Sequence, residues 1–394
     1  MIRSLFQYAT FFASGLADHR LRALMRAHAA GVTPVQEDIS TMVPQALTDV
    51  AGHLCRAQDS GVDRGLGSFH LVRGWGASYP ETTGYIIPTL LALADRLGRE
   101  DLRARALEAA DWLVSIQRTD GGWQGGRVGE DRPSVVFNTA QVVRGLMAAH
   151  DAVGGSRYLK AAAGACDWMV SVQETDGSWA GHNFLGTRRV YDTYVSAPLL
   201  HMAERSGVEG YREAALKNLS WALTRQRPNG WFADADNTVK HNDRPITHTI
   251  AYTIDGLLEC FAHTADERLL DAAQRPAEAL LGTFERNRSL NGRYDAHWQG
   301  SETAITTGCA QLAIVWARLH RITGDPRWHA GCVRMVRWLV AVQRLSAQGP
   351  APMHGAVTGS FPLWGRYEKF ACPNWAQKYL ADALLCAEGR TPRY

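Results

Sequence analysis

The chain has 394 residues, of which 46% are hydrophobic and 21% charged, and its formal net charge is +3. This composition excludes a disordered chain, and so small a charge without a basic run gives no indication of a nucleic-acid partner. Because no apolar run reaches the roughly 18 residues that a spanning helix needs, we expect no membrane span. The seven cysteines form no CxxC pair, which favours reduced thiols in the cytoplasm over a disulfide framework.

Residues 1–40 form the first predicted unit, a helical arm that packs on the rest of the protein. Its opening segment, MIRSLFQYATFFASGLA, contains one arginine and the polar Gln7, and it has no clean small-residue cleavage site. It is therefore a poor secretory signal. We expect a cytoplasmic protein, with export as the alternative.

Between residues 41 and 394, two kinds of helix alternate. The first kind is amphipathic and recurs six times, at register positions spaced by 53 to 59 residues. Four copies carry a Trp followed five residues later by Gln, at Trp112/Gln117, Trp168/Gln173, Trp221/Gln226 and Trp338/Gln343. The other two copies hold His53/Gln58 and Ala279/Phe284 in the same register. Their charged faces predict that these helices form an outer layer.

The second kind of helix is apolar around most of its circumference, which is typical of helices buried on all sides. Six copies begin near Pro80, Ser134, Val190, Thr247, Ala304 and Cys372. Six outer and six inner helices in alternation predict an all-α fold, an (α/α)6 toroid of six helix hairpins that occupies residues 41–394 as one domain.

The connections between the helices are unequal in length. Short turns such as LGRED lead from an inner helix to the next outer helix, whereas long loops lead from outer to inner. Long loops in a compact domain are usually functional. All six long loops emerge where the inner helices begin, so we expect the polar side chains at these starts to line the mouth of a central funnel.

Two sets of side chains at this mouth are candidate site residues. The candidate catalytic residues are Tyr367, His248, Tyr252, Tyr191, Glu81 and Asp192. The candidate substrate-binding residues are Trp75, Tyr85, Asn138, Gln141, Arg188, His241, Trp298, Gln311, Trp364, Arg366, Asn374 and Lys378. Asn138 or Asp192 alone would be interpreted as a helix cap, but a ring of such groups converging on one concavity favours a binding site.

The chemistry of these groups suits an acidic sugar. Aromatic rings pack on sugars, and arginine offers two parallel donors to a carboxylate. We expect the neighbouring Arg366 to lower the pKa of Tyr367 and so fit it for proton transfer. His and Cys recur without any ligand spacing, so neither a metal ion nor another cofactor is expected.

The loops QRTDGGW and QETDGSW, at residues 117–123 and 173–179, are interpreted as structural. Asp-Gly favours a tight turn, and the Gln side chain can satisfy backbone groups at the end of the helix. The Trp would then pack the loop back onto the barrel. Such QW-like loops resemble those of terpene cyclases and protein prenyltransferase β-subunits, so they mark a fold and not a reaction.

Two further segments carry a second resemblance, TTGCAQLAIVWARLHRITGDPRW at 306–328 and GRYEKFACPNWAQKYLADALL at 365–385. With the alternating helices, they resemble α/α-toroid proteins of bacterial polysaccharide biosynthesis clusters, the helical catalytic domain of glucuronyl C5-epimerases, and (α/α)6 polysaccharide lyases. The resemblance implies that a polysaccharide or oligosaccharide is the substrate. It also implies removal of the C5 proton from a uronic acid residue, followed by epimerisation or elimination.

The chemistry so implied has candidate groups in this sequence. Arg366, Asn138, Gln311 and His248 are available to neutralise the uronate carboxylate. Tyr367, Tyr252, Tyr191, Tyr85 and Glu81 are the candidate proton-transfer groups. The alternatives are a glycoside hydrolase that pairs Glu81 with Asp192, Asp243 or Glu368, a terpene cyclase-like enzyme, and a glycan-binding protein without catalysis.

Overall fold

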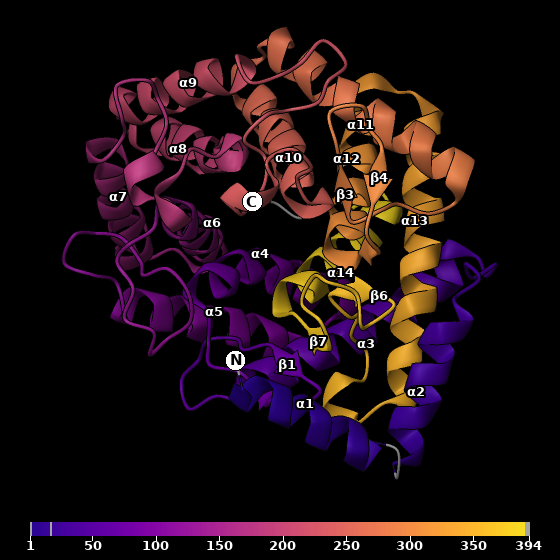
Figure 1. The fold of residues 1–394 in the computed structure, drawn as a ribbon. Helices are drawn as coiled ribbons and strands as arrows, with labels where there is room; N and C mark the ends of the chain where they lie inside the picture. The colour runs from indigo at the N-terminus through magenta and orange to yellow at the C-terminus, as the bar shows by residue number, and fades with distance from the viewer. Residues whose placement is uncertain (1, 16–17, 391–394) are drawn as a thin grey trace.

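Two concentric rings of helices form the protein, whose computed structural model describes residues 2–15 and 18–390 (Figure 1). The inner ring consists of α4 (Pro80–Leu97), α6 (Val136–Val153), α8 (Thr193–Ser206), α10 (Thr247–Thr264), α12 (Thr306–Thr323) and α14 (Asn374–Ala387). The outer ring consists of α3 (Ile39–Asp59), α5 (Glu100–Ser115), α7 (Ser156–Ser171), α9 (Glu209–Leu223), α11 (Glu267–Asn287) and α13 (Pro326–Leu345). The predicted (α/α)6 toroid is confirmed.

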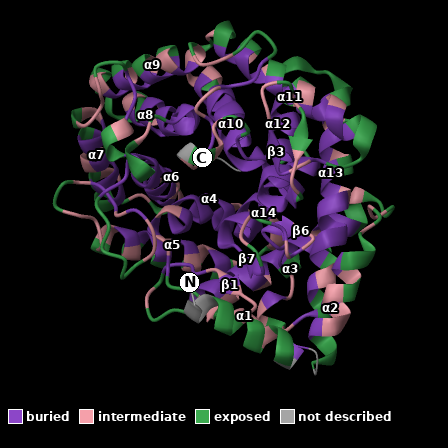
Figure 2. Cartoon of the chain, viewed as in Figure 1, coloured by how far each residue is buried: buried purple, intermediate pink, exposed green. Residues whose placement is uncertain are grey.

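The ring closes because α14 contacts both α12 and α4. Figure 2 shows the inner helices as almost wholly buried and the outer helices as exposed on their outward faces. The difference in polarity between the two kinds of helix therefore decides which ring each one joins.

Glycines allow the inner helices α4 and α6 to approach each other closely. A Cβ atom on Gly145 of α6 would lie 2.2 Å from the carbonyl oxygen of Gly84 on α4. A Cβ atom on Gly84 would in turn lie 2.6 Å from the carbonyl oxygen of Gln141. No side chain fits at either position, so the two backbones touch.

The Trp/Gln loops are structural, as predicted. The Nε2 atom of Gln117 donates to the carbonyl of Gly121 in its own loop and to that of Ala161 on α7, both at 2.8 Å. The Nε1 atom of Trp123, which is fully buried, donates at 2.8 Å to the carbonyl of Leu113 on α5. Each loop is thereby fastened to two outer helices. The equivalent bonds to a loop and to the next outer helix are made by Gln173, Gln226 and Gln343.

Short elements order the long loops. Three sheets are made by β1 (Phe69–His70), β2 (Gly74–Trp75) and β7 (Ala371–Cys372), by β3 (Arg293–Tyr294) and β4 (Gly300–Ser301), and by β5 (Ala304–Ile305) and β6 (Ser360–Phe361). The 3₁₀ turns are η1 (Ala180–His182), η2 (Phe184–Gly186), η3 (Val190–Asp192), η4 (Val239–His241), η5 (Ser346–Gln348) and η6 (Ala351–Met353). Phe69 pairs with both Trp75 and Cys372, so the first and last long loops are joined across the seam of the ring.

Two helices precede the toroid, α1 (Ile2–Gly15) and α2 (His19–Ala30). They cover a small apolar cluster that includes Leu24, Phe69 and Phe370. Helix α3 begins at Ile39, so the expected boundary between residues 40 and 41 falls within its first turn. Among the described helices, none is both long and apolar enough to cross a bilayer. All seven cysteines are unpaired thiols.

A buried network of charged side chains fills the centre of the ring. Arg144 on α6 and Arg318 on α12 both pair with Glu259 on α10, at 2.6 and 2.9 Å. The fully buried Lys378 and Asp382 of α14 pair at 2.9 Å. Paired charges are tolerated there because each has an opposite partner. The network separates the mouth from a cavity of about 170 Å³ on the short-turn side of the ring.

Candidate active site

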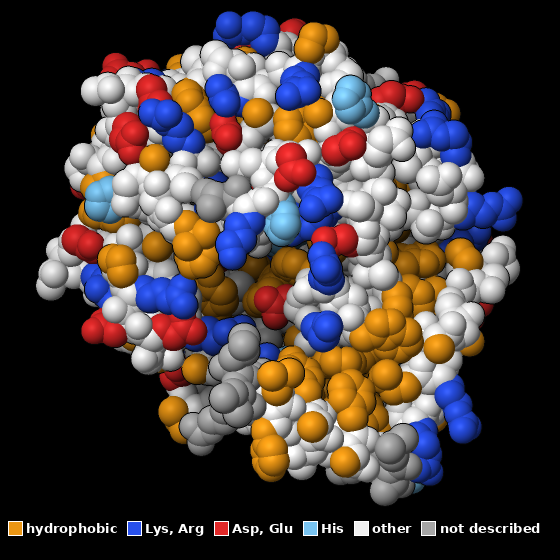
Figure 3. All heavy atoms as spheres, viewed as in Figure 1, with side chains coloured by type: hydrophobic (Ala, Val, Ile, Leu, Met, Phe, Trp, Pro, Cys, Tyr) orange, Lys and Arg blue, Asp and Glu red, His pale blue; other side chains and the backbone are white. Residues whose placement is uncertain are grey.

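A cavity of about 350 Å³ opens where the inner helices begin, as the sequence predicts. Figure 3 shows it as a hollow with acidic and basic side chains around its rim. Helices α4, α6 and α10 contribute Glu81, Thr82, Tyr85, Phe137, Asn138, His248, Thr249 and Tyr252. The loops and the helix ends next to them contribute Tyr79, Arg127, Glu130, Arg132, Asn183, Phe184, Tyr191, Asn237, Tyr367, Glu368 and Trp375.

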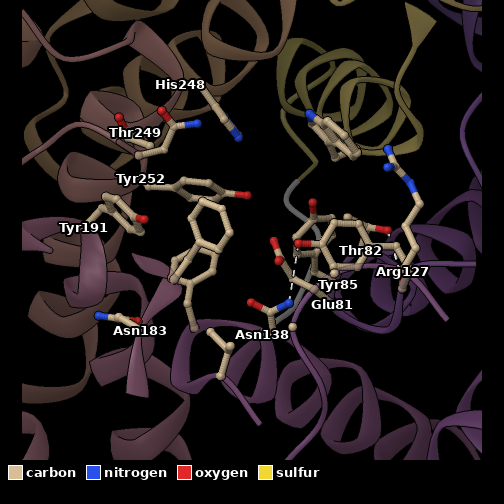
Figure 4. Close-up of a pocket in the computed structure, with 18 of the residues that line it drawn as sticks. Glu81, Thr82, Tyr85, Arg127, Asn138, Asn183, Tyr191, His248, Thr249 and Tyr252 are labelled. Atoms are coloured by element: carbon tan, nitrogen blue, oxygen red, sulfur yellow. Dashed lines mark hydrogen bonds between the residues drawn. The ribbon is translucent and has the colours of Figure 1, made fainter. Parts of the chain in front are cut away.

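Glu81 lies in the first turn of α4 and faces the cavity (Figure 4). Burial raises its pKa to about 7, although the Tyr79 hydroxyl bonds to the carboxylate and opposes the shift. The Tyr79 oxygen also accepts from Nδ2 of Asn138 at 3.4 Å. Since both protonation states of Glu81 exist near neutral pH, this carboxyl group can give or take a proton there.

His248 points into the cavity from the side opposite Glu81 (Figure 4). Its Nδ1 atom lies 2.7 Å from Oε1 of Gln311 on α12. An amide oxygen only accepts, so Nδ1 carries the proton and Nε2 has a free lone pair. Burial lowers the pKa of His248 to about 4. The imidazole is therefore neutral above that pH and has the form of a general base.

The pKa values of the cavity tyrosines differ from the expectation. Burial raises the pKa values of Tyr85, Tyr252 and Tyr367 well above that of a free phenol, so these hydroxyls stay protonated. The lowered pKa expected for Tyr367 is wrong. The side chain of Arg366 is 76% exposed and pairs with Glu302 at 3.2 Å, so it does not stabilise a phenolate. Tyr367 instead accepts at 2.9 Å from the indole nitrogen of Trp375.

Two arginines of the loop before α6, Arg127 and Arg132, line the cavity. Arg132 pairs with Glu130 at 2.9 Å. Arg127 forms no ion pair within 4.0 Å with any residue that the structure describes. Burial raises the pKa of the Glu368 carboxyl, and the nearby Arg127 opposes this rise. Arg127 is thus available to a negatively charged ligand.

The structure brings seven predicted site residues to the cavity. They are Tyr367, His248, Tyr252, Tyr191, Glu81, Tyr85 and Asn138. Five others lie buried behind its wall, namely Asp192, Gln141, Gln311, Asn374 and Lys378. These five belong to inner-helix starts but bond to other protein groups. Asn374 donates to the Leu66 carbonyl at 2.8 Å, Gln141 donates to that of Phe137 at 3.3 Å, and Lys378 belongs to the central charged network.

Asp192 does not line the cavity but bonds to a residue that does. Its Oδ2 atom accepts at 2.6 Å from Nδ2 of Asn183, which lines the cavity. Burial raises the pKa of Asp192 to about 7, against the opposing effects of Asn183 and Arg189. Asp192 is therefore a candidate positioning group, as Gln311 is for His248.

Six predicted residues lie on loops away from the cavity: Trp75, Arg188, His241, Trp298, Trp364 and Arg366. The ring centroid of Trp75 lies 5.3 Å from that of Phe69, and Arg188 pairs with Asp176 at 3.0 Å. Trp298 donates at 3.0 Å to the carbonyl of Asn229. These loops are irregular, so no periodicity predicts their course. The six side chains point away from the cavity.

Several cavity residues lie outside the two candidate sets. Tyr79 and Trp375 stand at inner-helix starts, so the register of the ring places them at the mouth, although the sequence assigns them no role. Arg127 belongs to one of the long loops expected around the mouth, but nothing in the sequence separates it from the loop arginines that point elsewhere. Asn183 likewise follows from the folded loop alone.

Sequence comparisons find partial matches. The squalene-hopene cyclase C-terminal domain family matches residues 67–190. A lanosterol synthase of Aspergillus fumigatus is 23% identical over 172 residues, which are 41% of this chain and 22% of that protein. The chain thus matches about a fifth of the length of this relative. The family match includes the two loops that hold Trp123 and Trp179, whose contacts are structural.

Structure comparisons find matches over the whole ring. An unsaturated glucuronyl hydrolase specific for heparin has a TM-score of 0.71 and 15% identity, covering 89% of this chain and 97% of that chain. The unsaturated glucuronyl hydrolase of Bacillus sp. GL1 has a TM-score of 0.67 and 16% identity, covering 87% and 96%. A polysaccharide lyase has a TM-score of 0.64 and 10% identity, covering 89% and 97%. The chain is therefore similar in fold to the (α/α)6 toroids of these carbohydrate-active enzymes.

Proposed function

We propose that this protein is a carbohydrate-active enzyme that transfers a proton at C5 of a uronic acid residue in a glycan. One observation carries the proposal. A neutral imidazole, His248, and a carboxyl group with a pKa of about 7, Glu81, face each other across one cavity. A base on one side and an acid on the other is the arrangement that removal and return of a proton on opposite faces of a sugar requires.

Each chemical step has a group to perform it. Nε2 of His248 removes the C5 proton, and the electron pair of the C–H bond moves into the uronate carboxylate as an enolate. Arg127 stabilises the charge that develops on the carboxylate oxygens. Glu81 then protonates C5 from the opposite face, which gives the epimer. If the C4–O bond breaks instead, the electron pair forms the C4–C5 double bond, and Glu81 protonates the leaving oxygen.

The comparisons support an acidic sugar as substrate. The similar structures include enzymes named as unsaturated glucuronyl hydrolases and one named as a polysaccharide lyase. The polar groups of the cavity also suit a sugar better than an isoprenoid, which is bound in a dry, apolar site.

A second candidate function is glycoside hydrolysis, which needs two carboxyl groups at the scissile bond. Glu81 and Glu368 both line the cavity, and burial raises both pKa values. Of the other partners considered for Glu81, Asp192 lies behind the wall and the side chain of Asp243 is exposed on its loop.

Exchange in heavy water tests the proposal. The enzyme is incubated with uronate-containing polysaccharides and oligosaccharides in D₂O, and deuterium at C5 is read by NMR. Deuterium in an intact glycan indicates epimerisation, and an unsaturated uronate at a new chain end indicates elimination. His248→Ala should abolish either product. New reducing ends without exchange or unsaturation would overturn the proposal in favour of hydrolysis.

A further inference from the structure

Helix α1 is apolar on two opposite faces. Arg3 is the only charged residue in its sequence, IRSLFQYATFFASG. Its inner face packs on Phe370, whose ring centroid lies 5.9 Å from that of Tyr8. On its outer face Leu5 is 63% exposed and Phe6 is 72% exposed. A helix on the surface of a protein in water normally turns polar residues outward, so this outer face lacks the partner that its composition suits.

Basic residues outnumber acidic ones in α1 and α2, and Lys369 is a further cation. Residues 2–30 contain four arginines and a single acidic residue, Asp18. Arg20 and Arg26 of α2 are exposed. Lys369 is also exposed, and it adjoins Phe370, on which α1 packs. Aromatic and aliphatic side chains flanked by cations are the composition of helices that lie in the interface of an anionic bilayer.

The exposed face of α1 lies beside the mouth of the cavity. Glu368 lines the cavity, and Phe370, two residues later, contacts the rings of Tyr8, Phe11 and Phe12. Figure 3 shows an apolar area over α1 on the same face of the molecule as the hollow. A flat surface bound by α1 would therefore also lie next to the cavity opening.

We propose that α1 docks the protein on an anionic lipid bilayer, with Leu5 and Phe6 in the interface and the cavity mouth beside the membrane surface. Charge complementarity selects the occupant, because the flanking arginines and lysine match lipid phosphates and anionic head groups. The inference goes beyond the proposed function and does not depend on it. It directs the search for a substrate to glycans attached to lipids.

Sedimentation with vesicles tests the docking. The full chain is mixed with vesicles of phosphatidylcholine alone or of phosphatidylcholine with phosphatidylglycerol, and the bound fraction is measured. We expect binding to the anionic vesicles that weakens with added salt. The double variant Leu5→Glu with Phe6→Glu should lose about ten-fold or more in partition coefficient, since two apolar side chains no longer enter the interface.

Val208→Glu is the matched control, because Val208 is an exposed valine at the start of α9, on the short-turn side of the ring. This variant should bind vesicles like the wild type, and circular dichroism should give all three proteins the same melting temperature. Failure of the wild type to sediment with anionic vesicles would overturn the docking. So would a dimer, seen in gel filtration, that the double variant abolishes without any vesicle binding. Sedimentation involves no turnover, so either result leaves the C5 chemistry to its own test.

Discussion

Nδ1 of His248 lies 2.7 Å from Oε1 of Gln311, a residue of the neighbouring inner helix. Both side chains are buried, and only His248 reaches the cavity. The contact sets the tautomer of the imidazole and leaves Nε2 to the cavity. The lone pair on Nε2 of His248, the proposed base, therefore depends on the side-chain amide of Gln311, which does not line the cavity.

Changing this amide should change the pH dependence of the reaction. In Gln311→Glu, a carboxylate beside the imidazole favours the imidazolium form and raises the pKa of His248. The neutral base is then lost at a higher pH, so the acid limb of kcat/KM moves upward. Gln311→Leu should instead lower kcat by roughly 10- to 100-fold, because the tautomer is no longer fixed. Rate profiles over pH for the three proteins check this. An unshifted acid limb in Gln311→Glu would show that His248 is not the base.

The wild-type enzyme should have a bell-shaped profile. The base must be neutral, which requires a pH above about 4 for His248. The acid must be protonated, which requires a pH below about 7 for Glu81. We expect the highest kcat/KM between these values. In Glu81→Gln the rate should fall and the alkaline limb should disappear. An alkaline limb that persists in this variant would assign it to another group.

The stability of the fold should depend on Asp192. Its pKa is raised from 3.8 to about 7 by burial, so the fold favours the neutral carboxyl. This contribution is fully present below pH 3.8 and is lost as the pH rises through about 7, at roughly 1.4 kcal/mol for each unit of pKa shift. Asp192→Asn removes the ionisation and keeps an acceptor for Asn183. Its melting temperature should exceed that of the wild type at pH 8 and approach it at pH 4. Parallel curves for the two proteins would contradict the raised pKa.

The contact between α4 and α6 should tolerate no side chain. Gly145→Ala places a Cβ atom 2.2 Å from the carbonyl oxygen of Gly84, so one helix must move, at a cost of roughly 1–3 kcal/mol. Gly52→Ala on α3 is the control, because the nearest atom to a Cβ at this position is the flexible end of the Arg56 side chain on the same helix, at 3.6 Å. That variant should gain about 0.4–1 kcal/mol. Urea denaturation of both variants measures the two effects, and equal stabilities would contradict the tight contact.

The fold could be predicted because its determinants are periodic. Trp112/Gln117 and its copies repeat at nearly constant spacing, and the apolar helices between them have no polar face to turn outward. The site was predictable only where it shares that periodicity. Glu81 and Tyr85 stand at a helix start and face the axis, and the register of the ring brings them to the cavity.

The rest of the site depends on details that spacing does not contain. Gln311 and Lys378 stand at the same level of the ring as cavity residues, but Gln311 bonds to His248 and Lys378 pairs with Asp382 in the central charged network. Trp298 and Arg127 lie in loops whose paths are fixed by turns and by contacts with other loops. Only the folded chain shows that Trp298 points away from the cavity and Arg127 toward it.

The charged network of Arg144, Glu259 and Arg318 fills the centre of the ring, so the cavity is closed at its inner end and opens only at the mouth. In the reaction that we propose, substrate and product would therefore share this one opening, and a polymer would not be threaded through the toroid. Product that has not departed therefore occupies the place of the next substrate. We expect product inhibition to be competitive, and the enzyme to release its glycan after each event instead of sliding along it.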